Sequence, residues 1–269
     1  MKKTILLFVA ATLLFVQSVK ASDRIVMEGS TTVLPIAQKT AEVYMDGNPQ
    51  AQISVRGGGS SVGITSLIDG TCDIADASRS IKDTELEKAA SRGVSPKAHV
   101  VAMDGIVLIV NPSNTVNGLT KQQAKDIFTG KVSNWSEVGG RNEKIVSISR
   151  DSSSGTFEAF GALVLGGAKV RPDALLQASN QAVVSIVSQT PGAIGYVGLG
   201  YVTGAVKSLE FEGVKASKET VLTGKYKVGR PLFMYTNGDP KGATKNFIDF
   251  VKSAEGQKIA EQEGFVGLK

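Results

Sequence analysis

Three short runs of glycine, serine and threonine hold the residue types best suited to chemistry in this chain. They are residues 29–32 (GSTT), 57–61 (GGGSS) and 150–156 (RDSSSGT), and each lies between a strand-like apolar stretch and a stretch with helical spacing. That position places backbone N–H groups and hydroxyls at helix N-termini, where unpaired donors and the helix dipole attract small anions. Three such termini in one chain predict a shared pocket for a tetrahedral oxyanion.

The third run is the most specific of the three. Arg150 supplies a planar fork of donors that suits a tetrahedral anion, and the next helix begins directly after it. Taken singly, the first two runs are better explained by ordinary helix caps or flexible glycine turns. The geometry that all three share favours an anion site, which requires no metal and no cofactor. The predicted ligand groups belong to Thr31, Thr32, Ser60, Arg150, Ser152, Ser154, Gly155 and Thr156.

The first 21 residues have the pattern of a secretory signal. Lys2 and Lys3 precede an apolar run over residues 5–16, and Ala21 offers a small residue at a cleavage point. We expect cleavage after Ala21 and a mature, exported chain. The segment carries three of the five net positive charges, so the mature chain is only mildly basic, at +2. With no basic stripe interleaved with aromatics, this charge argues against nucleic-acid binding.

The remaining pattern predicts an α/β fold with a largely parallel sheet covered by helices. Cys72 is the only cysteine, so no internal disulfide forms and the hydrophobic core must hold the fold. Strands are expected at residues 25–27, 52–55, 73–77, 98–102, 106–110, 144–149, 192–197 and 231–236. Helices are expected at residues 32–45, 61–68, 82–92, 120–128, 156–165, 181–189, 241–253 and 255–263.

The order of these elements predicts two lobes. The first half winds as one α/β unit, and the strand and helices from Pro231 onward return to it. We therefore expect a discontinuous lobe I of residues 22–106 plus 232–269, and a lobe II of residues 107–231. Two crossover strands near residues 106–110 and 231–236 would form the hinge, with ligand bound between the lobes at the carboxyl ends of strands.

At these motifs the chain resembles the periplasmic phosphate-binding proteins of ABC-type phosphate uptake systems. The resemblance covers nearly all of residues 24–269. It implies a two-lobed clamp of the type II periplasmic-binding-protein fold, which closes on inorganic phosphate and delivers it to a permease in the inner membrane. It also implies a monomer that is not an enzyme. The matching stretches are residues 29–35, 59–63, 73–79, 119–135, 150–156 and 192–196.

The resemblance also implies roles for single residues. One lobe would bind phosphate with the Thr31 hydroxyl, the Thr32 N–H and both donors of Ser60, and the other with Arg150, Ser154, Gly155 and Thr156. Well-known members of the family carry aspartates where this chain has Ser78 and Ser152, and the first of these accepts the phosphate proton. We expect Ser78 to line the site and Asp104 to be the proton acceptor. Sulfate has no proton to donate to this acceptor and would leave it unpaired, so the site would favour phosphate over sulfate by roughly 10⁴-fold.

Several classes of function remain open at this point. Residues 59–63 (GSSVG) match the nucleophile elbow of a serine hydrolase, with Asp73 or Asp76 and His99 following in the expected order. We discount this interpretation because His99, the sole histidine, is better explained as an edge-strand residue, and because a hydrolase gives Arg150 no role. The same residues are compatible with a clamp for sulfate or molybdate, with a phosphate sensor and with a surface adhesin. No P-loop is present.

Four further residues have two possible roles each. Trp135 and Tyr196 are interpreted as packing residues, because a small inorganic anion offers no face on which an aromatic ring can stack. Asp76 and Arg79 either pair with each other at the end of a strand, or Arg79 adds positive charge to the cleft.

Overall fold

The computed structural model describes residues 23–268. The predicted signal segment and its cleavage point lie outside this range. Among the described residues, no helix has the length and apolar character that crossing a bilayer demands.

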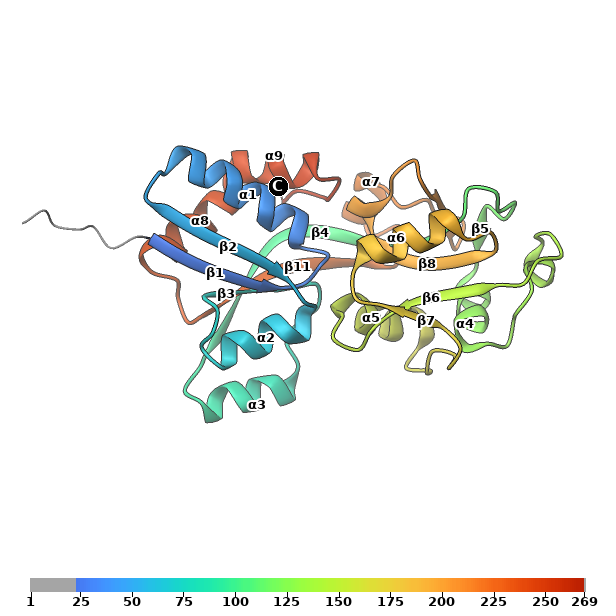
Figure 1. Ribbon diagram of the computed structural model, residues 1–269, viewed down its shortest axis with the longest axis horizontal. Helices are drawn as coiled ribbons and strands as arrows, with labels where there is room; N and C mark the ends of the chain where they lie inside the picture. The colour runs from blue at the N-terminus through green and yellow to red at the C-terminus, as the bar shows by residue number, and fades with distance from the viewer. Residues whose placement is uncertain (1–22, 269) are drawn as a thin grey trace, which may run out of the picture.

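The chain folds into two α/β lobes that share one continuous mixed sheet of nine strands (Figure 1). Along the sheet the strands run in the order β2-β1-β3-β11-β4-β8-β6-β7, with β9 paired to β4. The first four strands of this order and the first half of β4 belong to lobe I. The second half of β4 and the remaining strands belong to lobe II, so within residues 23–268 the polypeptide passes between the lobes along β4 and β11.

Lobe I is built around three parallel strands, which bury alternate side chains on the two faces of the sheet. Ile25 and Met27 of β1 are fully buried against one layer of helices, whereas Val26 packs on the opposite side. The strands are β1 (Asp23–Gly29), β2 (Ala51–Gly57) and β3 (Ile74–Ala77). The helices on one face are α1 (Leu34–Gly47), α8 (Gly242–Lys252) and α9 (Ala254–Gln262), and those on the other are α2 (Ser60–Ile68) and α3 (Asp83–Ser91).

Lobe II repeats this layered design around β8 and β6, which are parallel to each other. The tightest aromatic contact of its core stacks Phe160 on Tyr196, with ring centroids 4.0 Å apart. The strands are β5 (Gly118–Leu119), β6 (Val146–Arg150), β7 (Leu175–Gln177), β8 (Ala193–Gly198), β9 (Lys207–Ser208) and β10 (Glu210–Phe211). The helices are α4 (Lys121–Thr129), the 3₁₀ turn η1 (Trp135–Val138), α5 (Gly155–Phe160), the π-helix η2 (Gly161–Leu165), α6 (Asn180–Gln189), the 3₁₀ turn η3 (Leu199–Tyr201) and α7 (Lys218–Leu222).

The two crossover strands are β4 (Pro96–Val110) and β11 (Gly229–Asn237), which pair antiparallel. Ala102 and Leu232 pack in the core of lobe I, whereas Ile106 and Val228 pack in the core of lobe II. The change of lobe therefore occurs around Asp104 and its direct partner Arg230. The two expected strands at 98–102 and 106–110 form a single strand, because β11 pairs with β4 up to Gly105 and β8 pairs with it from Ile106 onward, so the segment between them stays extended.

Most other expected elements are present, with boundaries shifted by a few residues. Thr120 caps α4 as predicted, accepting a hydrogen bond from Gln123 N at 3.1 Å. The predicted helix over 156–165 is divided between α5 and the π-helix η2. The short strands β5, β7, β9 and β10 and the helix α7 were not expected, because two to five residues show no periodicity.

Candidate functional site

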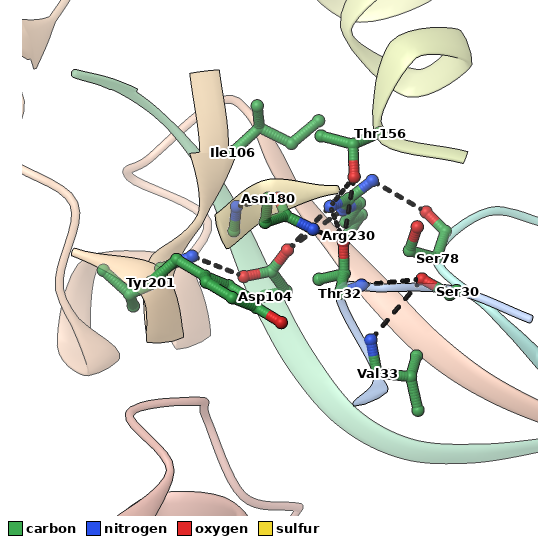
Figure 2. A network of polar contacts seen from close by, with 12 residues as sticks. Ser30, Thr32, Val33, Ser78, Asp104, Ile106, Thr156, Asn180, Tyr201 and Arg230 are labelled. Atoms are coloured by element: carbon green, nitrogen blue, oxygen red, sulfur yellow. Dashed lines mark hydrogen bonds and ion pairs between the residues drawn. The ribbon is translucent and has the colours of Figure 1, made fainter. Parts of the chain in front are cut away.

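A cluster of buried polar side chains lies where the two lobes meet, around the crossover point (Figure 2). Each member exposes at most 6% of its surface, which is unusual for polar groups without a structural or binding role. The members are Ser30, Thr31, Thr32, Ser60, Ser78, Asp104, Arg150, Ser154, Thr156, Asn180 and Arg230.

The first run places Thr31 and Thr32 in a turn between β1 and α1. The Thr31 hydroxyl accepts from Arg150 Nη2 at 3.1 Å, and the Thr32 hydroxyl lies 2.9 Å from that of Thr156, so both threonines contact lobe II. The helix expected from residue 32 begins later, because its cap is Val33 and its first residue is Leu34. The Ser30 hydroxyl accepts from Thr32 N at 3.1 Å and holds the turn before the helix.

The second run brings the N-terminus of α2 against lobe II. The Ser60 hydroxyl accepts from Ser78 N at 3.0 Å and lies 3.4 Å from the Ser78 hydroxyl. A Cβ on Gly155 would stand 2.2 Å from the Ser60 oxygen, so only glycine permits this approach of the lobes. Gly59 is equally constrained: its φ is +100°, and a Cβ there would lie 2.4 Å from the Ser153 hydroxyl.

Arg150 ends β6, and its guanidinium lies between the lobes while it is only 1% exposed. Nε donates to the Gln177 carbonyl at 3.0 Å, and Nη2 donates to the Ala178 carbonyl at 2.9 Å and to the Thr31 hydroxyl. Nη1 has no hydrogen-bond partner in residues 23–268. Burial lowers the pKa of Arg150, because the charged form loses water, and the charge of Asp151 opposes this only in part.

The rest of the third run divides into buried and exposed residues. Ser154 caps α5, accepting from Phe157 N at 3.2 Å, and Gly155 and Thr156 form its buried first turn. Ser152, by contrast, is exposed, and the structure does not bring it to the cluster. Its neighbour Ser153 makes the contact with lobe I instead, donating to the Gly58 carbonyl at 3.0 Å.

Asp104 faces Arg230 across the crossover strands. Arg230 donates to Asp104 Oδ2 from Nε at 3.1 Å and from Nη2 at 2.9 Å, while Leu199 N donates to Oδ1 at 2.8 Å (Figure 2). Burial raises the pKa of the Asp104 carboxyl, and the Arg230 charge opposes that rise. Arg230 Nη2 also donates to the Thr156 hydroxyl at 2.9 Å and contacts that of Thr32 at 3.4 Å.

Three residues of the site were missed by sequence reasoning: Asn180, Tyr201 and Arg230. Asn180 Nδ2 donates to the hydroxyls of Thr31 and Thr32, both at 3.1 Å. The Tyr201 hydroxyl donates to the Thr31 carbonyl at 2.6 Å. For Asn180 the available signal was Ser179, a helix-capping residue type just before the predicted helix at 181–189.

The net charge of the cluster is positive. Asp104 neutralises Arg230, whereas the partners of the Arg150 guanidinium among the described residues are carbonyl and hydroxyl oxygens. A buried cation without a counterion is costly, and a small anion that accepts its free N–H groups offsets that cost. The cluster is therefore suited to hold one compact oxyanion by hydrogen bonds from both lobes.

The structure does not assemble a serine-hydrolase triad. His99 Nε2 lies 2.9 Å from the Thr236 hydroxyl in lobe I, and neither Ser60 nor Ser61 contacts it. Asp76 is 1% exposed and both of its carboxylate oxygens lack partners in the described part of the chain. Burial raises its pKa. No cluster of three or more His, Cys, Asp or Glu side chains suited to a metal occurs among residues 23–268.

The other residues with two possible roles have clear positions. Trp135 is buried and donates from Nε1 to the Gly192 carbonyl at 2.9 Å, so it packs in lobe II as predicted. Tyr196 also packs in the core, and its hydroxyl accepts from Arg150 N at 3.2 Å. Arg79 does not pair with Asp76; its ion pairs are with Glu85 at 2.7 Å and Glu158 at 2.9 Å.

Comparison with known proteins identifies the family. Residues 16–255 match the family model described as PBP superfamily domain. The phosphate-binding protein PstS of Bacillus subtilis is 35% identical over 252 residues, which cover 92% of this chain and 81% of that protein. The phosphate-binding protein PstS of Borreliella burgdorferi is 34% identical over the full length of both chains.

A solved structure gives the same result. The putative phosphate ABC transporter substrate-binding protein of Clostridium perfringens, solved with bound phosphate, superposes with a TM-score of 0.86 at 36% identity. The match covers 91% of this chain and all of that one. All three relatives are named as binding proteins, and none as an enzyme. The chain belongs to the PBP superfamily and, within it, to the family of phosphate-binding proteins PstS.

Proposed function

We propose that this protein binds inorganic phosphate between its lobes and delivers it to the permease of an ABC transporter. The relatives that carry this function by name match nearly the whole chain, and one of them was solved with phosphate bound. Binding is the whole of its chemistry, and transport requires only that the lobes close on the anion and open again.

The observation that carries this proposal is the environment of Arg150. The guanidinium is buried at the meeting of the lobes, and within residues 23–268 its hydrogen-bond partners are all neutral and both N–H groups of Nη1 are free. We propose that these N–H groups bind phosphate together with hydroxyl and backbone donors of both lobes. The proposed donors are Thr31, Thr32, Ser60, Ser78, Ser154, Gly155 and Thr156.

We propose that Asp104 acts as the counterion of Arg230 and does not accept the phosphate proton. A carboxylate has about four acceptor positions. Arg230 supplies two donors and the backbone N–H of Leu199 a third, so three of these positions are filled. With Ser78 and Ser152 in place of the aspartates of well-known family members, no carboxylate of the cluster is free to take that proton.

Titration calorimetry with phosphate, sulfate and molybdate tests both proposals. We expect phosphate to bind at micromolar or lower concentration, because several charge-assisted hydrogen bonds easily supply the roughly 8 kcal/mol required. The affinity for phosphate should exceed that for sulfate by much less than the roughly 10⁴-fold that an unpaired acceptor provides. Failure of phosphate to bind would refute the function. A roughly 10⁴-fold preference for phosphate over sulfate would show that a carboxylate does accept the phosphate proton. Tighter binding of molybdate or sulfate would favour that oxyanion as the ligand instead.

The proposal also covers the location of the protein, its oligomeric state and the boundaries of its lobes. We propose that the chain is exported to the periplasm after cleavage at Ala21, and that it acts there as a monomer. We also propose lobe boundaries at the crossover, with residues 22–106 and 232–269 in lobe I and residues 107–231 in lobe II. The change of core between Ala102 and Ile106, and between Val228 and Leu232, supports a crossover within a few residues of these boundaries, with Ile106 itself packed in the core of lobe II. N-terminal sequencing of the exported protein and its sedimentation velocity test the first two.

A further inference from the structure

A charged cluster lies apart from the anion site, at a second place where the lobes touch. Glu158 projects from α5 of lobe II toward three donors of lobe I. Its Oε2 lies 2.9 Å from Arg79 Nε and 2.8 Å from Lys82 Nζ, and its Oε1 accepts from the Ser61 hydroxyl at 3.2 Å. The Arg79 contact is an ion pair by distance alone, because the Nε–H does not point at the carboxylate.

The lobe I side of this cluster is organised without Glu158. Glu85, near the start of α3, accepts from both terminal nitrogens of Arg79, at 2.8 Å and 2.7 Å. Arg79 Nη2 also donates to the Ser61 hydroxyl at 2.9 Å. When the lobes separate, Arg79 therefore keeps a full bidentate partner. The side chains of Arg79 and Glu158 are only 7% and 19% exposed, so solvent screens their attraction weakly.

Charge balance gives the cluster a preferred state. Lobe I contributes two cations, Arg79 and Lys82, against the single carboxylate of Glu85, and lobe II contributes Glu158. Every partner of the Glu158 carboxylate in residues 23–268 comes from lobe I. Only contact between the lobes neutralises both sides. Separation costs Glu158 all three partners at once, so the free energy of this cluster favours the closed arrangement.

We propose that Glu158, with Arg79 and Lys82, forms an interlobe latch that sets how long the ligand stays bound. The inference rests on the proposed phosphate binding, but the latch touches neither Arg150 nor the threonine hydroxyls of the site. Because it forms only after the lobes meet, it slows ligand release and leaves the encounter of ligand with the open form unchanged. Glu158 is thus a positioning residue rather than a phosphate ligand.

The first test is the rate of phosphate release, measured by stopped flow with a phosphate-trapping reporter. We expect Glu158→Gln to raise the release rate about tenfold, equivalent to about 1.4 kcal/mol, and to change the association rate by less than a factor of two. Glu87→Gln, an exposed residue of α3, is the matched control and should change neither rate. Lys82→Gln should have a smaller effect, and little further effect once Glu158 is replaced. An unchanged release rate in Glu158→Gln would overturn the latch while leaving phosphate binding intact.

A second test does not depend on the ligand. Spin labels are placed at Lys88 of α3 and Leu176 of β7, which are exposed and lie in different lobes, in a Cys72→Ala background. Double electron–electron resonance between the labels then reports the separation of the lobes. We expect Glu158→Gln to shift the distance distribution toward longer separations, and Glu87→Gln to leave it unchanged. An identical distribution in Glu158→Gln would overturn the latch, even if the unsubstituted protein bound no phosphate and the proposed function were thereby refuted.

Discussion

Replacing Arg150 with methionine removes the buried positive charge of the site while keeping most of the apolar length of the side chain. The two N–H groups of Nη1 have no partner in the described chain and are free to donate to an anion. A hydrogen bond to a charged group contributes about 1.5–3 kcal/mol. The loss of two such bonds predicts phosphate binding weaker by about 3–6 kcal/mol, or roughly 10²–10⁴-fold.

The same substitution should leave the fold almost unaffected. It deprives the carbonyls of Gln177 and Ala178 of donors, at about 1 kcal/mol each. It also removes a charge whose burial is unfavourable, as the lowered pKa of Arg150 indicates. These effects oppose each other, so the free energy of unfolding without phosphate should change by less than about 2 kcal/mol.

Calorimetry measures the affinity, and thermal unfolding with and without phosphate measures the stability. We expect Arg150→Met to lose most of the rise in melting temperature that phosphate produces, because a ligand stabilises only the state that it binds. Arg141→Met, an exposed arginine of lobe II, is the control and should behave as the unsubstituted protein. Unchanged phosphate affinity in Arg150→Met would refute the site.

Three further substitutions test other parts of the account. Gly155→Ala should weaken phosphate binding at least tenfold without unfolding either lobe, because its Cβ would collide with the α2 N-terminus; Gly161→Ala, where a Cβ meets nothing within 4 Å, should bind normally in the same titration. Asp104→Asn should lower the free energy of unfolding by about 3–5 kcal/mol in urea, because it leaves Arg230 buried without a counterion; a change below 1 kcal/mol would contradict this assignment. Asp76→Asn should stabilise the protein more at pH 8 than at pH 4. Burial raises the pKa of Asp76 in the folded state, so the unsubstituted protein loses stability as pH rises above the unfolded pKa of 3.8, and a pH-independent difference between the two proteins would be inconsistent with that shift.

The sequence was informative where chemistry is local. A glycine or serine run between a strand and a helix places donors at a helix N-terminus whatever the rest of the fold does. Ser60, Arg150 and Thr156 all belong to the buried polar cluster, and their role in binding stays a prediction. The exact turn before α1 was not predictable in this way. The Ser30 hydroxyl binds the N–H groups of Thr32 and Val33, and this local competition delays the start of the helix.

The contributions of Arg230 and Asn180 depend on contacts that the local pattern does not contain. Arg230 reaches the site because the register of β11 on β4 sets it opposite Asp104, 126 residues earlier in the chain. The sequence identified Asp104 as a polar residue at the crossover, but its counterion follows only from that register. Asn180 contacts threonines that are 148 and 149 residues away. Ser152 was misplaced for the opposite reason, because the run turns and exposes it while Ser153 faces lobe I.

A crystal structure of the protein grown with arsenate, a phosphate analogue with a strong anomalous signal, tests the central claim most directly. The account predicts one arsenic peak between the lobes, with arsenate oxygens within hydrogen-bond distance of Arg150 Nη1 and of the Thr31 or Ser60 hydroxyl. A peak held by one lobe alone, or none near Arg150 at a saturating arsenate concentration, would contradict it.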